Sequence, residues 1–474
     1  MRQTLTRTVV IGAGIAGSWL AYRLAKYGTP VVLLDAPHED TPTVSLGAAT
    51  VFHRPLVESK SPEDLAQVFL DETTTQHPEL RPLLMRYLPK EFAELSELVP
   101  FQTLESMLIP QHPMPFPRLQ AGGEVIALLH ERIRALGGTL MCGRVTDLLI
   151  EDGVCRGVAY LHDGQPGVVQ ASATVLASGG YSGLMRHAPT ANSGSMLGIF
   201  AAAGGELTNL EFSQRHALGD LTAGRVLYPP DLAGAEFYRA GERAVWLERA
   251  YATFAEERRD LEIFQRYWRN NGHIPHLLRR GDVSYELGPI YGLSMGGVAH
   301  IGGATNIAGV YAVGEARHDI AADAIIGRPW AIYISSSGML AETLRKLPDQ
   351  LMPEALSVSE RVGEVRAKLR QVISERLHDF EDHRFTDAAA TAFVEWCRTQ
   401  RREVPLVRSG ERGLLVLAES YALSAVSRRE SRGYFYRADF PTADPQLSGL
   451  RTLARYDAER DCVEVELVAN NGAS

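Results

Sequence analysis

Residues 8–35 read TVVIGAGIAGSWLAYRLAKYGTPVVLLD. Thr8–Ile11 is a short apolar run rich in β-branched residues, which predicts a buried parallel strand. Glycines follow in GxGxxG spacing, and residues 15–27 are typical of a helix. Pro30–Leu34 is a second apolar run, and Asp35 closes it. This order of strand, glycine turn, helix, strand and acid predicts an α/β fold with a Rossmann-like dinucleotide-binding domain.

Each residue type in this stretch suits the binding of a dinucleotide. Gly12 permits the tight turn, Gly14 lets a pyrophosphate approach the backbone, and Gly17 lets the helix pack closely on the strand. The helix N-terminus offers unpaired N–H groups and a partial positive charge. Asp35 is placed to accept hydrogen bonds from a ribose diol, which disfavours NADP. The motif by itself does not separate NAD from FAD.

Composition bounds the class of protein. The chain has 474 residues, which favours two or three domains. Its formal net charge is −9 and it has no long basic run, so a nucleic-acid or anionic-membrane surface is not expected. We find no apolar run of about 18 residues that would predict a spanning helix. The four cysteines are scattered without a CxxC pair, so we expect no metal site or disulfide framework, and a cytoplasmic location.

The sequence pattern predicts a nucleotide domain that is interrupted by an insertion. We assign residues 1–216 to the first part of this domain and residues 217–288 to a capping or substrate domain. In the insertion the β pattern gives way to Arg, Glu, Trp and Tyr, which predicts helices. The Gly-rich β pattern returns in residues 289–346, the second part of the nucleotide domain. Residues 347–474 are predicted to form a C-terminal helical domain.

Several short stretches resemble landmarks of one flavoprotein family, that of succinate dehydrogenase, fumarate reductase and L-aspartate oxidase. They occur in the family's order: VIGAGIAG, VLASGGYSG, LEFSQRH (210–216), LSMGGV (293–298), GVYAVGEA (309–316) and SRRESRGYFYRADFP (427–441). The resemblance implies FAD as cofactor, a small-molecule substrate, a cap over the flavin and a C-terminal helical bundle. Pro42 stands where the membrane complexes carry a histidine bonded to FAD, so non-covalent FAD is expected.

The motif and the resemblance together assign the cofactor contacts. They are Gly12, Gly14, Ala16, Gly17, Asp35, Ser45, Gly47, Ala48, Val145, Ala177, Gly179, Gly296, Gly297, Glu315, Ala331 and Ile332. The resemblance implies that Glu315 binds the ribityl chain and that Gly296-Gly297 runs beside the flavin. A tight turn between strands is the alternative explanation of these two glycines. The helix that starts after Arg328 is expected to point its N-terminus at the pyrimidine edge of the flavin.

On the substrate side, Gln214 and His216 match the family's Gln and His, and that histidine contacts a substrate carboxylate in the dicarboxylate enzymes. Arg328 is the best candidate for the arginine of the substrate site. Arg258 in the insertion is a candidate for the proton-shuttling arginine, although a solvated helix charge is the alternative.

Two departures from the family pattern bear on the substrate. The family's second histidine falls at Tyr291 or Gly292, and Phe435 stands where the C-terminal landmark normally has a histidine. Aromatic residues in the insertion would suit a bulkier and less polar substrate than succinate.

Three functions follow from these observations. The first is an FAD-dependent oxidase or dehydrogenase of an amino acid or another carboxylate-bearing molecule, with oxygen or another electron acceptor. The second is a flavin monooxygenase that uses NAD(P)H and oxygen, or a tailoring enzyme that acts on a larger natural product. The third is a non-catalytic flavin-bound subunit. Association into a homodimer is left open.

Overall fold

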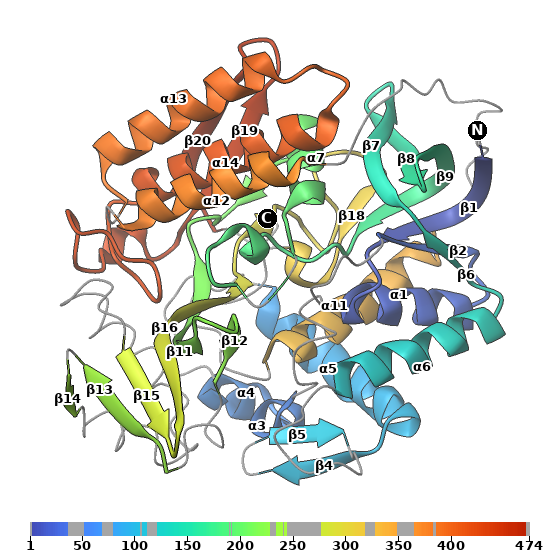
Figure 1. Ribbon diagram of the computed structural model, residues 1–474. Helices are drawn as coiled ribbons and strands as arrows, with labels where there is room; N and C mark the ends of the chain where they lie inside the picture. Colours follow the sequence, from blue (N-terminus) through green and yellow to red (C-terminus); the bar gives the residue numbers. More distant parts are fainter. Residues whose placement is uncertain are drawn as a thin grey trace.

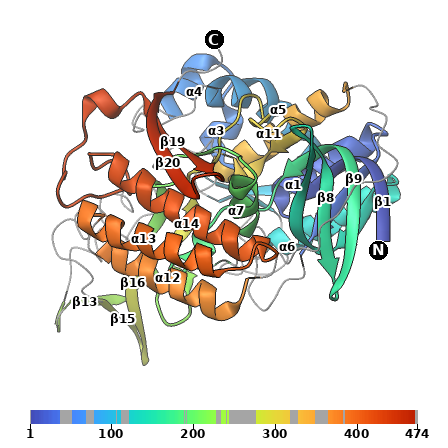
Figure 2. The ribbon, with the colours of Figure 1, turned by 90° about the horizontal axis from the view of Figure 1, so that it is seen from above.

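The fold is taken from a computed structural model of the chain (Figure 1). The structure describes residues 2–36, 52–68, 79–104, 107–110, 121–188, 190, 192–227, 234–239, 241–243, 276–317, 328–347, 365–382 and 385–470. The parallel sheet and its helices lie on one side of the molecule, and three C-terminal helices lie on the other (Figures 1 and 2).

A seven-stranded sheet forms the nucleotide domain, and it confirms the predicted Rossmann-like α/β fold. Its order is β6-β2-β1-β9-β8-β7, with β18 paired to β9. The strands are β1 (Arg2–Ile11), β2 (Val31–Asp35), β6 (Thr139–Cys142), β7 (Arg144–Glu151), β8 (Val154–His162), β9 (Gln165–Leu176) and β18 (Val310–Ala312). Strands β6, β2, β1, β9 and β18 pair in parallel, whereas β7 and β8 are antiparallel additions.

Helices cover this sheet through apolar faces. Helix α1 (Ile15–Lys26) follows β1, and α6 (Ala121–Ala135), α11 (Arg328–Leu344) and α5 (Leu80–Leu98) pack around it. The buried carboxylate of Glu91 on α5 accepts a hydrogen bond of 2.8 Å from the indole of Trp19 on α1. Short elements complete this side: β3 (Phe52–His53), α3 (Arg54–Glu58), α4 (Pro62–Val68), β4 (Phe101–Leu104) and β5 (Met107–Pro110).

The insertion differs from its prediction. Its described residues form an antiparallel sheet with the order β12-β11-β16-β15-β13-β14, so the expectation of helices is wrong for them. The strands are β11 (Ser213–Asp220), β12 (Arg225–Val226), β13 (Glu236–Arg239), β14 (Glu242–Arg243), β15 (His276–Arg280) and β16 (Val283–Ser294). Phe237, Leu278 and Leu287 are buried, and the residues on either side of each are less buried. This period of two favours strands over helices.

The C-terminal part combines the expected helices with a hairpin. Helices α12 (Ala367–Asp382), α13 (Asp387–Glu403) and α14 (Ser409–Ser427) are followed by β19 (Leu450–Asp457) and β20 (Cys462–Ala469). The hairpin extends a four-stranded sheet of order β17-β10-β19-β20, which includes β10 (Leu207–Thr208) and β17 (Gly297–Val298). Because β10 and β17 come from the nucleotide part of the chain, this sheet joins the two parts.

One hydrophobic core runs through both parts of the molecule, from Val9 in the parallel sheet to Val463 in the terminal hairpin. Helix α7 (Ser195–Ala202) crosses α14 at Gly198 and Gly413, where a Cβ on either glycine would lie about 2.5 Å from the other's backbone. Within the described ranges, none of the helices is long and apolar enough to span a bilayer.

Candidate functional site

The turn after β1 requires glycine for steric reasons. Gly12 has φ of +104°, and a Cβ on it would lie 2.5 Å from the carbonyl oxygen of Ala177 at the end of β9. A Cβ on Gly17 would lie 1.9 Å from the carbonyl oxygen of Gly12. Real Cβ atoms do not approach oxygen this closely, so these glycines set the fit of α1 against β1 and β9.

The N-terminus of α1 is open to a ligand. Its N-cap is Gly14, which provides no side-chain cap to the first turn. Asp35 lies at the end of the neighbouring strand β2, and its Oδ1 accepts a hydrogen bond of 3.1 Å from the backbone N–H of Ala13. Free helix N–H groups bind phosphate, and a carboxylate at the end of the second strand binds ribose hydroxyls.

A cavity joins these features to residues from distant parts of the sequence. Its lining consists of Gly12, Ala13, Gly14, Ile15, Ala16, Asp35, Ala177, Ser178, Gly179, Asn192, Glu315 and Tyr333. Bare glycine backbone, a helix N-terminus and a ribose-binding acid stand together here, so the residues present fit the pyrophosphate and ribose of FAD. Asn192 and Tyr333 were missed from the sequence, because only the tertiary fold brings them beside the glycine turn.

The other predicted cofactor residues lie outside this lining. Gly17 packs behind the turn, Val145 is buried on β7, and Ala331 and Ile332 are buried on α11 next to Tyr333. The predictions for Ser45, Gly47, Ala48 and Pro42 lie outside the described residues.

Glu315 is the buried carboxyl group of the cavity. Its Oε1 accepts hydrogen bonds from the backbone N–H (2.9 Å) and the hydroxyl (3.0 Å) of Ser294, and its Oε2 accepts from Nδ2 of Asn192 (3.0 Å). Burial raises the pKa of Glu315 to about 7, against the opposing effect of the donors on Ser294, Gly180 and Asn192. Ser294 directly precedes the Met-Gly-Gly stretch, and its role was not inferred from the sequence.

The double glycine of the Met-Gly-Gly stretch meets the protein's own backbone. A Cβ on Gly296 would lie 2.1 Å from the carbonyl oxygen of Asn209, and a Cβ on Gly297 would lie 2.5 Å from that of Ala316. Neither glycine belongs to the cavity lining described above. Close packing of chain segments therefore accounts for both glycines, and a contact with the flavin stays a prediction.

Strands β11 and β16 bring the predicted substrate segment toward the cavity. Ser213 pairs with Ser294, and His216 pairs with Ile290. Gln214 lies between them and is buried, with 4% of its surface exposed. Ile290, the strand partner of His216, lies four residues before Ser294 on β16. Ser294 donates hydrogen bonds to Glu315 of the cavity, so one short stretch of β16 contacts both the His216 segment and the cavity.

The tail landmark meets the segment that leads into β11. Nε of Arg428 lies 2.6 Å from Oε1 of Glu211, and its Nη1 lies 2.9 Å from Oε1 of Glu430, all with fully buried side chains. The second oxygen of Glu211 accepts a hydrogen bond of 2.7 Å from the hydroxyl of Thr452 on β19. Paired buried charges of this kind fix the relative position of two chain segments.

Tyr291 and Phe435, the side chains at the two positions that depart from the family pattern, are both buried in the interior of the protein. The hydroxyl of Tyr291 donates a hydrogen bond to Oε2 of Glu381 on α12, and the hydroxyl of Tyr421 donates to Oε1 of the same carboxylate. The ring of Phe435 lies 5.9 Å from that of Phe212 and 5.2 Å from that of Phe385. Tyr291 therefore faces the C-terminal helices, and Gly292 presents no side chain.

The structure says little about the two candidate substrate-site arginines, Arg328 and Arg258. Arg328 is the first residue of α11, so the helix begins one residue before the predicted start at Pro329. Arg258 lies outside the described residues. The structure thus gathers the nucleotide residues, brings the β11 backbone to the same region, and leaves the arginines as predictions.

Comparison with known sequences gives two family matches. Residues 7–271 match a family model described as FAD binding domain, and residues 405–470 match one described as Fumarate reductase flavoprotein C-term. L-aspartate oxidase of Pyrococcus abyssi is 24% identical over 91% of this chain and 95% of that protein. L-aspartate oxidase of Pyrococcus horikoshii is 23% identical over 92% of this chain and 96% of that protein.

Solved structures share the fold. E. coli quinol fumarate reductase FrdA superposes with a TM-score of 0.78 at 17% identity, covering 99% of this chain and 97% of that chain. The Mycobacterium smegmatis Sdh1 complex superposes with a TM-score of 0.73 at 19% identity, covering 99% and 94%. With the FAD-binding model matching more than half of its length, the chain belongs to the FAD-binding flavoprotein family of succinate dehydrogenase, fumarate reductase and L-aspartate oxidase, and it is an FAD-dependent oxidoreductase.

Proposed function

We propose that this protein is an oxidase or dehydrogenase of an amino acid or another carboxylate-bearing small molecule, with the layout of L-aspartate oxidase and an altered substrate site. One observation carries this proposal: β16 pairs with His216 through Ile290 and holds the cavity carboxylate of Glu315 through Ser294. The predicted substrate segment on β11 and the Glu315 carboxylate of the cofactor cavity thus both contact strand β16. When bound, FAD accepts a hydride from the carbon next to the carboxylate or amine.

The residues of this chain bind and orient the substrate. His216 and Arg328 hold the carboxylate, Gln214 contributes a hydrogen bond, and Arg258 of the insertion moves the proton that leaves the substrate. Positioning of this kind lowers the barrier because the reacting atoms no longer have to find one another. Glu315 binds the ribityl hydroxyls, and FAD is held without a covalent bond. Electrons leave to oxygen or to another acceptor.

The interior roles of Tyr291 and Phe435 support a substrate other than a simple dicarboxylate. A second buried carboxylate requires a cation or hydrogen-bond donors around it. Tyr291 is bound to Glu381, Gly292 has no side chain, and Phe435 packs among aromatic rings. These positions offer no cation to a substrate, which favours an amino acid or a larger monocarboxylate.

The test is the bleaching of the flavin under anaerobic conditions. The purified holoprotein is mixed separately with amino acids, dicarboxylates and NAD(P)H, and the visible absorbance of the oxidised flavin is followed. Bleaching by an amino acid or a carboxylate without nicotinamide is the expected result. Bleaching by NAD(P)H alone would contradict the proposal and favour a monooxygenase. A flavin that nothing reduces, dithionite included, would instead indicate a non-catalytic role.

A further inference from the structure

The terminal strand β20 is an edge strand whose outward backbone groups can be identified. Among the described residues, the sheet order β17-β10-β19-β20 leaves β20 with a single neighbour, β19. The N–H of Val463 donates to Oε1 of Glu419 on α14 (3.2 Å), so it points away from β19. In an antiparallel ladder this direction alternates along the strand. The N–H and C=O groups of Val465 and Leu467 therefore also point away from β19, on the side where the Glu419 carboxylate of α14 lies.

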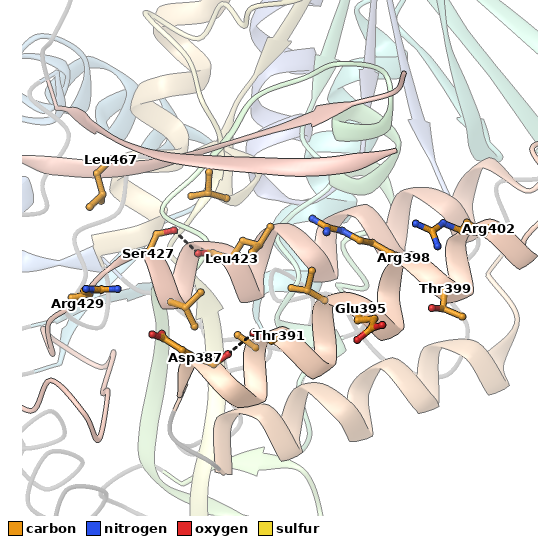
Figure 3. Close-up of a pocket in the computed structure, with 14 residues that line it drawn as sticks. Asp387, Thr391, Glu395, Arg398, Thr399, Arg402, Leu423, Ser427, Arg429 and Leu467 are labelled. Carbon is orange, nitrogen blue, oxygen red and sulfur yellow. Dashed lines mark hydrogen bonds between the residues drawn. The ribbon is translucent and has the colours of Figure 1, made fainter. Parts of the chain in front are cut away.

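A groove lies along this edge (Figure 3), between β20, α13 and the C-terminal half of α14. The larger apolar side chains of its lining, which we call its floor, are Val394, Leu423, Val426, Val465 and Leu467, and polar and charged side chains line the rest. An edge strand beside a helix with an apolar floor is the arrangement in which proteins accept an extended peptide as an added strand. Backbone hydrogen bonds then supply affinity, and every second side chain of the peptide enters the groove.

Basic side chains lie toward both ends of the groove. Arg402 lies at one end, with Arg398 and Glu395 next to it, and Arg429 lies at the other end on the side of Asp387 (Figure 3). Nε of Arg398 is 2.7 Å from Oε1 of Glu419. Arg402 and Arg429 form no ion pair within the part of the chain that the structure describes, although Arg429 lies over the ring of Phe440, 5.8 Å from its centroid. Two basic side chains thus stand open at the ends of an apolar floor.

The lining holds two acidic side chains beside its three arginines. They are Asp387, which pairs with Nη2 of Arg437 at 2.9 Å, and Glu395. Because the chain as a whole carries a net charge of −9, the cationic ends of the groove contrast with the rest of the molecule. Complementary charge favours an acidic partner here.

We propose that the groove binds an extended segment of a partner protein, which adds to the edge of β20 and carries carboxylates at both ends of a short apolar stretch. The helix from Asp387 to Arg402 rises about 22 Å, which about seven residues of an extended strand would cover. The segment would place two apolar side chains over the floor and one carboxylate near each of Arg402 and Arg429.

A second copy of this chain fits the same edge less well. Pairing β20 with another β20 would place Glu464 and Glu466 of both copies on one face, where like charges repel, an effect that the ion pairs of Glu464 with Arg460 and of Glu466 with Arg455 reduce. It would also bring the arginines of two grooves toward each other. A heterologous acidic segment has neither conflict.

The test uses a fluorescein-labelled peptide with the sequence Glu-Thr-Val-Thr-Leu-Thr-Glu, which places its acids and apolar residues on one face. Fluorescence anisotropy with the holoprotein is expected to show saturable binding. The same peptide with both acids replaced by lysine should bind at least tenfold more weakly. A copy that is N-methylated on the strand-pairing amides should also lose at least tenfold.

Variants of the protein locate the site. Val465→Pro removes an outward N–H that takes no part in the ladder, so the sheet is expected to survive and peptide binding to fall at least tenfold. The double change Arg402→Glu and Arg429→Glu should weaken binding by a similar factor. Lys346→Glu makes half the charge change on an exposed position after α11 and is the control that should bind normally. Flavin absorbance verifies that each variant retains its fold.

Two results would overturn the proposal. The first is an absence of peptide binding to the holoprotein at millimolar concentration, or equal binding by the groove variants and the control. The second is a dimer, measured by light scattering, that dissociates on Val465→Pro, because the edge would then be occupied by a second copy.

Discussion

Glu315 is a buried carboxyl group, and burial raises its pKa from 4.5 to about 7. The unfolded chain releases this proton near pH 4.5, while the folded chain holds it until about pH 7. Folding therefore becomes less favourable as the pH rises through this window, by about 3 kcal/mol from the pKa difference. We expect the FAD-free protein to lose this amount of stability relative to Glu315→Gln between pH 4.5 and 7, measured by urea unfolding.

Below pH 4.5 and above pH 7, the difference in unfolding free energy between the wild-type protein and Glu315→Gln should be constant. A stability difference that stays flat from pH 4 to 8, or that grows with pH, would show that Glu315 is ionised throughout and that its donors outweigh its burial.

Gly14 is the N-cap of α1, where a side chain would occupy the space of the pyrophosphate. We expect Gly14→Val to abolish FAD retention, measured as the ratio of flavin to protein absorbance after purification. Gly449 has nothing within 4 Å of its Cβ position and no positive φ, so Gly449→Ala is the control and should keep its flavin. If Gly14→Val retained a full complement of FAD, the proposal that the pyrophosphate binds at this turn would be wrong.

His216 is assigned to the substrate carboxylate. We expect His216→Ala to retain FAD and to slow flavin reduction by the substrate about a hundredfold or more, the usual effect of losing a positioned catalytic group. His162→Ala, on the exposed end of β8, is the matched control and should be reduced at the normal rate. Unchanged reduction in His216→Ala would return this histidine to a structural role.

The cofactor residues that could be predicted from the sequence are those that act through local geometry. Gly12, Gly14 and Asp35 follow from one strand–turn–helix–strand unit, whose spacing is fixed by the backbone itself. Asn192 and Tyr333 reach the same cavity from separate parts of the chain, and no local pattern marks either of them. The double glycine of Met-Gly-Gly was assigned to the flavin, but its closest neighbours are Asn209 and Ala316.

Helices α7 and α14 are the elements that join the nucleotide part to the C-terminal part. A Cβ on Gly413 would lie 2.6 Å from the backbone of Gly198, so the helices would have to separate. We expect Gly413→Ala to destabilise the holoprotein by about 1–3 kcal/mol, the range of overpacking changes, in urea unfolding. Gly449→Ala, where the added Cβ meets nothing within 4 Å, is the control. Equal stability of both variants would contradict the close crossing.

Two elements show where pattern reasoning failed. The insertion is rich in Arg and Glu, which favour helices, yet Phe237 and Leu278 are buried between less buried neighbours in strands β13 and β15. Tertiary burial outweighs composition there. The hairpin β19–β20 was missed although its strands are adjacent in sequence and β20 alternates apolar and acidic residues. Only its pairing with β10, more than 200 residues earlier, leaves no mark in a local window.

The domain boundary at residue 347 stays a prediction, and the hydrophobic core is continuous across it. Val10 beside the nucleotide turn and Leu415 on α14 belong to one cluster. A ligand that binds only the folded state stabilises everything that unfolds with its site, by about 2.7 kcal/mol at a hundred times its dissociation constant. We therefore expect FAD to slow amide exchange in α14 as much as in α1, by about a hundredfold at that concentration.

Hydrogen exchange with and without FAD, read by mass spectrometry for peptides of α1 and α14, measures this coupling. Exposed residues of the turn between β19 and β20 serve as the internal control, because they exchange without unfolding of the core. If α1 slows and α14 does not, the C-terminal part opens as a unit of its own, and the boundary at residue 347 is a thermodynamic one. Equal slowing would mean that the flavin stabilises the helices on which the proposed groove is built, so that loss of FAD would loosen the groove as well.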